Sequence, residues 1–362
     1  MSRRVGVGII GCGNISPAYL QSAVAFPILK IRALADTDPL AARARGEQFS
    51  VPVASVEDLL ADPAIEIVLN LTTPQAHVEV GLKAVMAGKH VYSEKPLGID
   101  TVEARQLLEC AEARKRRVGC APASFLADVH QTCRKMIDQG AIGAPIGGTA
   151  FFMCPGHERW HPSPAFYYLR GGGPMLDMGP YYITVLVNLL GPVARVAAMA
   201  IQPHATRTIG NSPLRGTVIA VEVPTHVAGT LHFHCGAVVT LTMSFDVPKH
   251  RHTPLEIYGT EGSLLVPDPD LFDGEIQHAT LGGEWIAVPN EHGADEQSSR
   301  AIGLADMAQA IRARRPHLAS GALAFHVLEV IEAFIRSSDS GHFIGIESRP
   351  MRPEALPVNG QH

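Results

Sequence analysis

A glycine-rich turn directly after the first apolar run is the feature that most constrains the fold of this chain. Val5 to Ile10 is short and apolar, Gly11-Cys12-Gly13 follows at once, and a helical pattern then continues through Ala25. A buried strand that turns tightly into a helix is typical of the start of a βαβ unit. Gly6-x-Gly8-x-x-Gly11 has a similar spacing, but Gly6 and Gly8 lie within the strand, so we interpret that match as coincidental.

The residues of this turn are of the types that a bound pyrophosphate requires. Gly11 permits the tight turn, Gly13 lets the backbone approach the phosphates, and Ser16 is small enough for helix and strand to pack closely. Asn14 and Ile15 lie at the start of the helix, where backbone amides favour an anion. The turn therefore predicts a dinucleotide-binding site.

Asp36, at the end of the second strand-like run, bears on which dinucleotide is bound. A carboxylate at this position accepts hydrogen bonds from the adenosine ribose and repels a 2′-phosphate. We interpret Arg43 and Arg45, which follow on a predicted helix, as surface residues, although they leave NADP open. We therefore predict NAD as the cofactor in preference to NADP.

The first third of the chain alternates strand and helix patterns, which indicates a parallel, doubly wound sheet. The expected strands are 5–10, 31–35, 65–71, 90–93 and 118–121, and the expected helices are 14–25, 41–49, 76–87 and 101–116. We expect residues 1–122 to form the dinucleotide-binding domain.

The pattern changes after residue 122. A linking helix is expected over 126–139, and beyond Pro145 longer runs with a period of two predict a large, mainly antiparallel sheet. The clearest strands are 217–223, 227–234, 237–245 and 255–258, with a hairpin turn at 259–262 and late helices at 300–314 and 322–337 that pack on the sheet or on the first domain. We expect an α/β substrate-binding and oligomerisation domain over 123–347, followed by a loose tail over 348–362.

Two further strands of the first domain end in residues suited to a ligand site. Thr72-Thr73-Pro74 closes one strand, and Glu94-Lys95-Pro96 closes the next. Parallel strands present their carboxyl ends at one edge of the sheet, where ligands bind. We therefore expect Thr72, Thr73, Pro74, Glu94 and Lys95 to contact the cofactor. His77 also falls near this edge and is a further candidate to contact the cofactor, with a packing or capping role left open.

Composition excludes several classes of protein. Charged residues make up 18% of the 362 residues and the formal net charge is -5, which gives no basic excess for nucleic acid. No apolar run is long enough to span a membrane, and Arg3-Arg4 is not followed by an export-signal pattern. The six cysteines have no paired spacing, which is typical of reduced thiols and predicts a cytoplasmic protein.

With these motifs in register, the chain resembles the Gfo/Idh/MocA oxidoreductase family, named for glucose–fructose oxidoreductase and inositol dehydrogenase. The resemblance covers nearly the whole chain. It rests on the Gly11-Cys12-Gly13 turn, Ala35-Asp36, Thr73-Pro74 with His77, Glu94-Lys95-Pro96, Gly140-Ala141-Ile142-Gly143, Gly172 to Gly179, and Gly259-Thr260-Glu261-Gly262. It implies a Rossmann domain, an α/β domain whose open sheet mediates homodimers or homotetramers, and an active-site role for Lys95.

The sequence departs from the family pattern at one position. Many members have Asp-x-Gly-x-His, whereas this chain reads Asp177-Met178-Gly179-Pro180-Tyr181, so Tyr181 takes the place of the histidine. Asp177 and Tyr181 stand four residues apart and are expected on one helical face. Tyr181 can exchange a proton with a substrate hydroxyl if Lys95 and a nicotinium charge lower its pKa. We predict Lys95, Tyr181 and Asp177 as catalytic residues and leave open whether Lys95 or Tyr181 accepts the proton.

The segment from Gly156 to Arg170 is rich in polar and aromatic residues and leads into the Tyr181 helix. We expect it to border the substrate pocket, with an aromatic ring against the sugar and polar groups on its hydroxyls. The candidate substrate-binding residues are His157, Arg159, Trp160 and Tyr168, together with Lys95, Asp177 and Tyr181. Histidine pairs such as His157/His161 lack a further ligand in register, so no metal is predicted.

These features favour an NAD-dependent sugar or polyol dehydrogenase acting on CH–OH. Two alternatives stay open. One is an enzyme that retains NAD and uses transient oxidation to drive glycoside cleavage or elimination. The other is a non-catalytic NAD-binding sensor or regulator, against which the intact Lys95 and Tyr181 and the lack of a basic segment speak.

Overall fold

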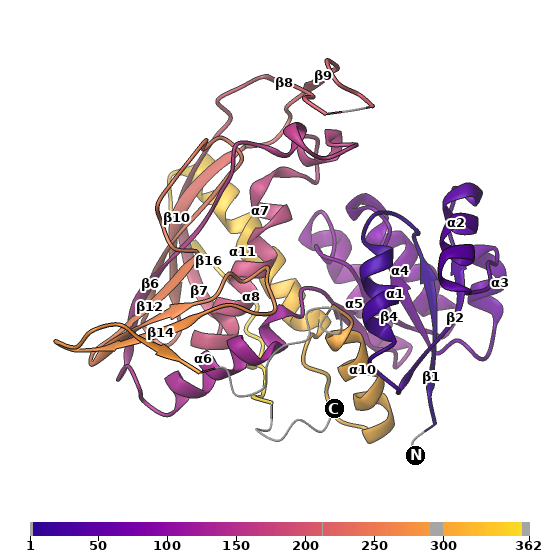
Figure 1. Cartoon of the computed structure of the whole chain (residues 1–362), viewed down its shortest axis with the longest axis horizontal. Coiled ribbons are helices and arrows are strands. Elements are labelled where there is room, and N and C mark those ends of the chain that lie inside the picture. Colours follow the sequence, from indigo (N-terminus) through magenta and orange to yellow (C-terminus); the bar gives the residue numbers. More distant parts are fainter. Residues whose placement is uncertain (1–2, 212, 290–299, 357–362) are drawn as a thin grey trace. The chain divides into compact units, whose positions relative to one another are not determined.

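The computed structural model describes residues 3–211, 213–289 and 300–356 (Figure 1). These residues divide into two compact units. Unit 1 is drawn from Met1–Ala127, Ala294–Phe325 and Leu356–His362, and unit 2 from Asp128–Gly293 and His326–Ala355. The division differs from the expected boundary at 122/123, and it also returns part of the late chain to the first unit.

Unit 1 contains a parallel sheet with the strand order β2-β1-β3-β4-β5. Its strands are β1 (Val5–Ile10), β2 (Leu29–Ala35), β3 (Ile67–Asn70), β4 (His90–Ser93) and β5 (Val118–Cys120). Its helices include α1 (Ser16–Ala23), α2 (Pro39–Phe49), α3 (Val56–Ala61), η1 (Pro74–Ala76), α4 (His77–Met86), α5 (Thr101–Ala113), η2 (Ser124–Leu126) and α10 (Ile302–Ala313). Every residue of β1 is buried, as expected for a central strand of a sheet covered on both faces. The predicted doubly wound fold is confirmed.

The two glycines inside β1 have a packing role. A Cβ atom on Gly6 would overlap the carbonyl oxygen of Ala64, and one on Gly8 would lie 2.7 Å from Leu59. These positions are glycine because neighbouring chain approaches the strand too closely for any side chain. The interpretation of the Gly6-x-Gly8-x-x-Gly11 spacing as coincidental is consistent with this packing.

The late helix α10 belongs to unit 1. The Ala301 amide donates to Ser22 Oγ at 3.0 Å, and Arg312 forms a two-pronged ion pair with Glu66, with contacts of 2.6 and 2.8 Å. Ser320 also forms an isolated β-bridge with Gly119 of β5. These contacts join the late part of the chain to unit 1. Their partners lie at the start of β3, on α1 and in β5, all far earlier in the sequence. The boundary between Phe325 and His326 falls within α11 (Gly321–Ser340).

Unit 2 is built on a sheet with the order β15-β14-β13-β12-β6-β11-β10-β7-β16 among the described residues. The strands are β6 (Pro145–Met153), β7 (Val193–Ile201), β10 (His226–Phe233), β11 (Val238–Ser244), β12 (Leu255–Gly259), β13 (Gly262–Val266), β14 (Ile276–Thr280), β15 (Ile286–Val288) and β16 (Ile344–Gly345). Only β6 and β11 are parallel among the pairs described. The predicted mainly antiparallel sheet is therefore confirmed.

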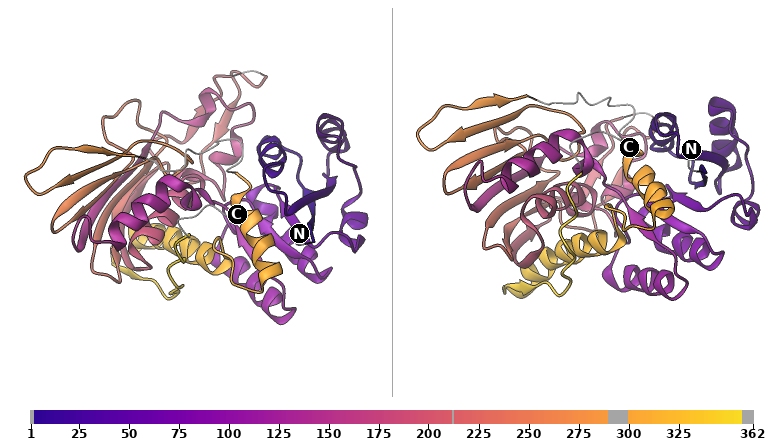
Figure 2. Two further views of the ribbon diagram at one scale, coloured as in Figure 1. Left: turned by 60° about the horizontal axis from the view of Figure 1, so that its bottom comes forward. Right: turned by 90° about the horizontal axis from the view of Figure 1, so that it is seen from below.

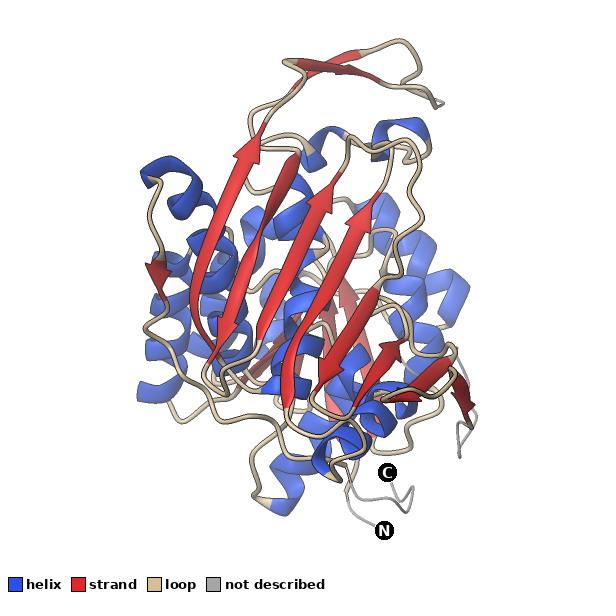
Figure 3. Cartoon of the chain, turned by 90° about the vertical axis from the view of Figure 1, so that its left-hand side faces the viewer, coloured by secondary structure: helices blue, strands red, loops and turns tan. Residues whose placement is uncertain are grey.

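Burial alternates along the strands of this sheet. In β11, Val239, Leu241 and Met243 are buried whereas Val238 and Thr240 are exposed. The helices α6 (Asp128–Asp138), α7 (Gly173–Asp177) and α8 (Gly179–Leu190) lie on one face of the sheet (Figure 2). All residues of α8 are buried, so it is the central core helix of the unit. Figure 3 looks onto the opposite face, where the strands lie in front of the helices. Short turns η3 (His157–Arg159) and η4 (Ala165–Tyr167) precede α7.

Three segments differ from the sequence-based expectation. Instead of a long strand at 217–223, β9 (Val218–Ala220) pairs with β8 (Thr206–Thr208) in a separate two-stranded sheet, seen at the top of Figure 1. The pattern also did not reveal α3, which is short and of mixed polarity, or β7, which is mostly apolar and lacks a period of two. The expected loose tail is docked as far as Arg352, which donates to the Asn188 and Leu189 carbonyl oxygens at 2.7 and 2.6 Å. Residues 357–362 of that tail lie outside the described residues.

Candidate active site

The glycine turn lies at the point where the strand order of unit 1 reverses. β1 is flanked by β2 and β3, so Gly11 after β1 and Thr72 after β3 lie side by side at the carboxyl edge. Gly11 has a φ of 104°, and a Cβ atom there would lie 2.5 Å from the Leu71 backbone. Glycine is therefore required at this position. Such a switch point is where doubly wound sheets bind their ligands.

The surroundings of Gly13 fit a pyrophosphate. A Cβ atom on Gly13 would meet no atom within 4 Å, so the space beside this backbone is open. Helix α1 begins after Ile15 without a side-chain cap, and the positive end of its dipole favours an anion. The Ser16 and Ala18 amides donate to the Gly13 and Ile15 carbonyls at 3.2 and 3.1 Å, so the amides that meet the phosphates are those of the turn itself. Ser16 is fully buried and its hydroxyl donates to the Gly13 carbonyl at 2.8 Å, as expected for a small residue in the third glycine position.

Asp36 is held at the same edge by backbone amides. Its Oδ2 accepts from the Cys12 amide at 2.6 Å, and its Oδ1 accepts from the Asp38 amide at 2.8 Å. These contacts orient a carboxylate beside the glycine turn, where a ribose can reach it. Arg43 is exposed, and Arg45 donates to Gln48 at 2.7 Å along its own helix. The arrangement fits NAD.

Lys95 directly follows β4, and its backbone is tied to a buried carboxylate. The Lys95 amide donates to Glu94 Oε2 at 3.1 Å, and the Tyr19 hydroxyl donates to Glu94 Oε1 at 2.7 Å. Burial raises the pKa of Tyr19 well above its usual range, so this hydroxyl is a neutral donor. Sequence reasoning missed Tyr19, because an aromatic residue on a buried helix face carries no signal of its partner.

His77 is buried and joins two of the predicted cofactor loops. Its Nδ1 lies 2.6 Å from the Pro96 carbonyl oxygen and its Nε2 lies 3.0 Å from that of Thr72. Burial lowers the pKa of His77, although both carbonyl contacts oppose this effect. Asn70 supports the same junction, because its side-chain amide donates to the His77 carbonyl at 2.9 Å. His77 therefore has a packing role: its ring contacts the loop after β3 on one side and the loop after β4 on the other.

The substrate half of the predicted site lies in unit 2, where a break separates two short helices. Asp177 is the last residue of α7, and Met178 links it to α8, which carries Tyr181. The Tyr181 amide donates to the Met178 carbonyl at 3.1 Å, so the turn continues through the break. Both tyrosines are buried, with Tyr181 5% and Tyr182 1% exposed, and the Tyr182 hydroxyl donates to Asp268 at 3.3 Å.

The loop before α7 brings three of the predicted residues together. His157 Nε2 lies 3.1 Å from Asp177 Oδ2, and the Trp160 indole nitrogen donates to His157 Nδ1 at 3.2 Å. Trp160 remains 57% exposed, whereas His157 is buried. Arg159 points away from this group and donates to the Pro155 carbonyl at 3.1 Å.

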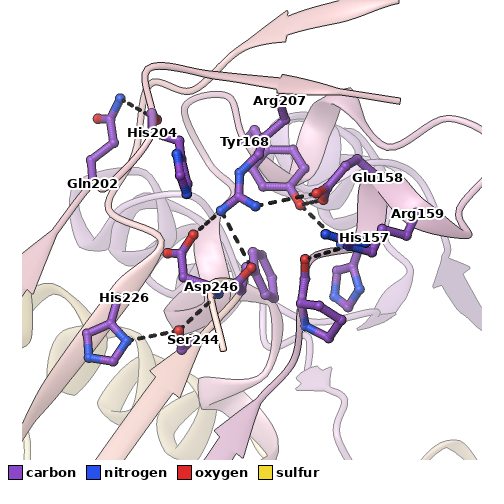
Figure 4. Close-up of polar contacts among 12 residues, drawn as sticks. His157, Glu158, Arg159, Tyr168, Gln202, His204, Arg207, His226, Ser244 and Asp246 are labelled. Carbon is purple, nitrogen blue, oxygen red and sulfur yellow. Dashed lines mark hydrogen bonds and ion pairs between the residues drawn. The ribbon is translucent and has the colours of Figure 1, made fainter. Parts of the chain in front are cut away.

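Tyr168 lies with the core instead of at a surface open to a ligand. Its ring is fully buried against Val221 and Phe245, and its hydroxyl donates to Glu158. Glu158 in turn faces Arg207 Nη1 at 3.4 Å, and Arg207 also pairs with Asp246 (Figure 4). Glu158, Arg207 and Asp246 were not predicted, because their partners are distant in sequence.

Each unit thus holds its own part of the prediction. Unit 1 gathers the predicted cofactor residues Gly11, Gly13, Asn14, Ile15, Asp36, Thr72, Thr73, Pro74, His77, Glu94 and Lys95 on the loops after β1 to β4. Unit 2 gathers His157, Trp160 and Asp177 in one hydrogen-bonded group, with Tyr181 on the following turn. The pairing of Lys95 with Tyr181 stays a prediction.

The described part of the chain contains no group of three or more His, Cys, Asp or Glu side chains arranged to hold a metal ion. Nor does any helix within the described ranges have the length and apolar character needed to cross a membrane.

Several characterised proteins are similar to this chain. It is 28% identical over 263 residues to 1,5-anhydro-D-fructose reductase from Ensifer adhaerens, covering 71% of this chain and 74% of the relative. It is 25% identical over 299 residues to levoglucosan dehydrogenase from Pseudarthrobacter phenanthrenivorans, covering 73% of each. The fold matches that of levoglucosan dehydrogenase in complex with NADH and L-sorbose with a TM-score of 0.84, over 96% of this chain and 100% of the other, at 20% identity.

Two family models together account for both units. Residues 5–121 match the oxidoreductase family with an NAD-binding Rossmann fold, and residues 130–265 match the GFO/IDH/MocA C-terminal domain. NAD is accordingly the cofactor of the first unit, in agreement with the turn around Gly13 and with Asp36. The chain belongs to the Gfo/Idh/MocA family of NAD-binding oxidoreductases.

Proposed function

We propose that this protein is an NAD-dependent dehydrogenase that moves a hydride between a hydroxyl-bearing carbon of a sugar or polyol and the cofactor. The position of Lys95 carries the proposal, since it follows β4 at the edge where the glycine turn and Asp36 hold the dinucleotide. The names of the relatives support the substrate class, because they include an anhydrofructose reductase, levoglucosan dehydrogenase and an inositol dehydrogenase.

In this proposal the bound cofactor supplies the hydride acceptor, and the protein supplies orientation and proton transfer. Lys95 and Tyr181 hydrogen-bond the substrate hydroxyl, and one of them takes its proton as the carbon is oxidised. Glu94 holds the Lys95 backbone in place, because its carboxylate accepts hydrogen bonds from the Lys95 amide and the Tyr19 hydroxyl. Asp177 accepts a hydrogen bond from a second hydroxyl of the substrate and thereby selects its orientation.

The loop from Gly156 to Arg170 is proposed to cover the substrate. Trp160 exposes more than half of its surface, so its ring can pack on the apolar face of a sugar. Arg159 is exposed in this loop and supplies a cation at the rim. Tyr168, in contrast, supports this loop from the core.

The test is a screen of NAD+ reduction across sugars, inositols and glycosides, followed by Lys95→Ala with the best substrate. We expect Lys95→Ala to abolish turnover while NADH still binds, as measured by fluorescence titration. Lys83→Ala is the matched control, because Lys83 is exposed and pairs only locally with Glu79 at 2.7 Å in the contacts described. Wild-type turnover in Lys95→Ala would overturn the assignment. Product formation without stoichiometric NADH would instead favour the NAD-retaining alternative.

The open face of the large sheet is proposed to form a homodimer or homotetramer interface. Met199 on β7 is 79% exposed, and it stands in register with Ala228 on β10 and Thr242 on β11. An apolar and small-residue surface of this kind favours a second copy of the sheet. Light scattering is expected to report an oligomer for the wild type and dissociation for Met199→Arg, and a monomeric wild type would refute the proposal.

A further inference from the structure

The hydrogen bonds of His157 define which of its ring nitrogens carries the proton. The Trp160 indole nitrogen is a donor only, and it lies 3.2 Å from His157 Nδ1. His157 Nδ1 must therefore accept, which places the proton of the neutral ring on Nε2. A protonated ring would bring two N–H groups face to face at this contact.

The proton on Nε2 has an acceptor in place. Asp177 Oδ2 lies 3.1 Å from His157 Nε2, so the imidazole donates directly to the carboxylate. Asp177 is the last residue of α7 and directly precedes the Met178 link to α8. A directed hydrogen bond here sets the rotation of a carboxylate that lies one turn before Tyr181.

The ring of His157 is also clamped in its orientation. The Tyr167 and Phe245 rings lie with their centroids 4.4 and 4.5 Å away, and the side chain is 9% exposed. The His157 backbone amide donates to the Tyr168 hydroxyl at 3.0 Å, which continues to Glu158 and Arg207 (Figure 4). Aromatic contacts on the ring and a buried polar network on the backbone together leave the imidazole little freedom.

We propose that His157 is a positioning residue that orients Asp177 through its Nε2–H tautomer, and that Trp160 selects this tautomer. The inference rests on the proposed function only in the step that places Asp177 against substrate. It replaces the direct substrate contact expected for His157 from the sequence. It also gives the half-exposed Trp160 a second role, since its indole N–H acts on Asp177 through one intervening ring.

The tautomer can be tested without any assay of activity. Protein labelled with 15N-histidine is compared with His157→Gln, and the signal that disappears belongs to His157. We expect that signal to show a protonated Nε2 and an unprotonated Nδ1 at neutral pH, and to shift toward a mixture of tautomers in Trp160→Phe. A protonated Nδ1, or a signal unchanged in Trp160→Phe, would overturn the proposal.

The kinetic test separates a positioning role from a merely structural one. His157→Gln keeps a side-chain N–H that can reach Asp177, whereas His157→Leu removes it. We expect His157→Leu to lower kcat by about 10–100-fold, the scale of a small misplacement of a reacting group, and His157→Gln to recover most of that loss. Equal losses in the two variants, or a change confined to KM, would contradict the proposal.

A double-variant cycle tests whether Trp160 acts through His157. Trp160→Phe keeps an aromatic ring but removes the indole N–H together with the five-membered ring, so it is expected to lower kcat several-fold in the wild type and to have no further effect on kcat in His157→Leu. Trp285→Phe is the matched control, since this second tryptophan makes no described contact with His157. Independent effects of Trp160→Phe and His157→Leu would refute the coupling. Failure of every substrate in the screen would count against the proposed function and leave the tautomer result standing.

Discussion

The stability of unit 2 should depend strongly on Arg207, the cation at the centre of a buried charge cluster. Its guanidinium lies 3.4 Å from Glu158, pairs with Asp246 and stacks 5.5 Å from the centre of the Tyr168 ring. Its side chain and that of Glu158 are 9% and 6% exposed. Replacing Arg207 with methionine keeps much of the side-chain volume but leaves two buried carboxylates without their cation.

The size of this effect follows from distance and burial. At an effective dielectric constant of about 20, a pair of unit charges at this separation attract by about 5 kcal/mol. Much of that attraction offsets the cost of removing the charges from water, but the carboxylates remain buried in the variant. Breaking a buried pair by removing one partner costs about 3–5 kcal/mol. We expect Arg207→Met to lower the free energy of unfolding of unit 2 by that amount.

Tryptophan fluorescence during urea unfolding is the assay, because both tryptophans of the chain, Trp160 and Trp285, lie in unit 2. With a denaturant slope of about 3 kcal/mol per M, the midpoint should fall by about 1–1.7 M. Lys83→Met is the control, since the Lys83–Glu79 pair is 57% and 69% exposed and its loss should cost less than about 1 kcal/mol. A shift in Arg207→Met no larger than that of the control would refute the reasoning. The triple variant Arg207→Met/Glu158→Gln/Asp246→Asn, in which all three groups are neutral, should recover stability relative to Arg207→Met. Its failure to do so would also count against the reasoning.

Three further predictions concern unit 1. Asp36→Ser should raise the ratio of kcat/KM for NADP to that for NAD by about 10–100-fold. NAD loses a charge-assisted hydrogen bond of about 1.5–3 kcal/mol, and NADP loses a charge that repels its 2′-phosphate. An unchanged ratio in steady-state assays would contradict this. Gly13→Ala should fold normally but bind NADH weakly, whereas Gly6→Ala should lower the melting temperature because its Cβ overlaps a backbone carbonyl; the reverse pattern in calorimetry and NADH titration would refute the assigned register. Burial lowers the pKa of His90 from 6.5 to about 4, so the folded state holds this ring neutral over a pH range in which the unfolded chain binds a proton. The free energy of unfolding should therefore be highest above pH 6.5 and should fall as the pH is lowered toward 4. Circular dichroism during urea unfolding measures this change. His90→Gln, which keeps an acceptor for the Arg117 amide, should flatten this dependence, and an equally steep profile would count against it.

Much of unit 1 could be predicted because its determinants are local. A short apolar run must become a buried strand, and Gly11 and Gly13 allow a turn that few other residues permit. Asp36, Thr72 and Lys95 end successive strands, and parallel pairing brings strand ends to one edge whatever the details of packing. The regular alternation of strand and helix therefore predicted both the fold and the neighbourhood of the cofactor residues.

The misses in both units share a physical cause, which is dependence on partners distant in sequence. Residues 218–220 look like part of a long strand, yet they pair with β8 and leave the large sheet. Nothing near Arg207 in the chain identifies Glu158 and Asp246 as its partners. Likewise, residues 301–325 join unit 1 through contacts such as that of Arg312 with Glu66, across most of the length of the chain.

The sequence by itself determined the class of the protein: a parallel dinucleotide-binding sheet, a second, mainly antiparallel sheet, and a lysine directly after a strand of the first sheet. These follow from periodicity and from the backbone freedom of glycine, which act over a few residues. Only the tertiary structure decided that His157 bonds Asp177 and Trp160, that Tyr168 belongs to the core, and that Tyr19 anchors the loop of Lys95. Hydrogen-bond direction and burial depend on which side chains the completed fold brings within about 3 Å of one another, and a linear pattern does not contain that information.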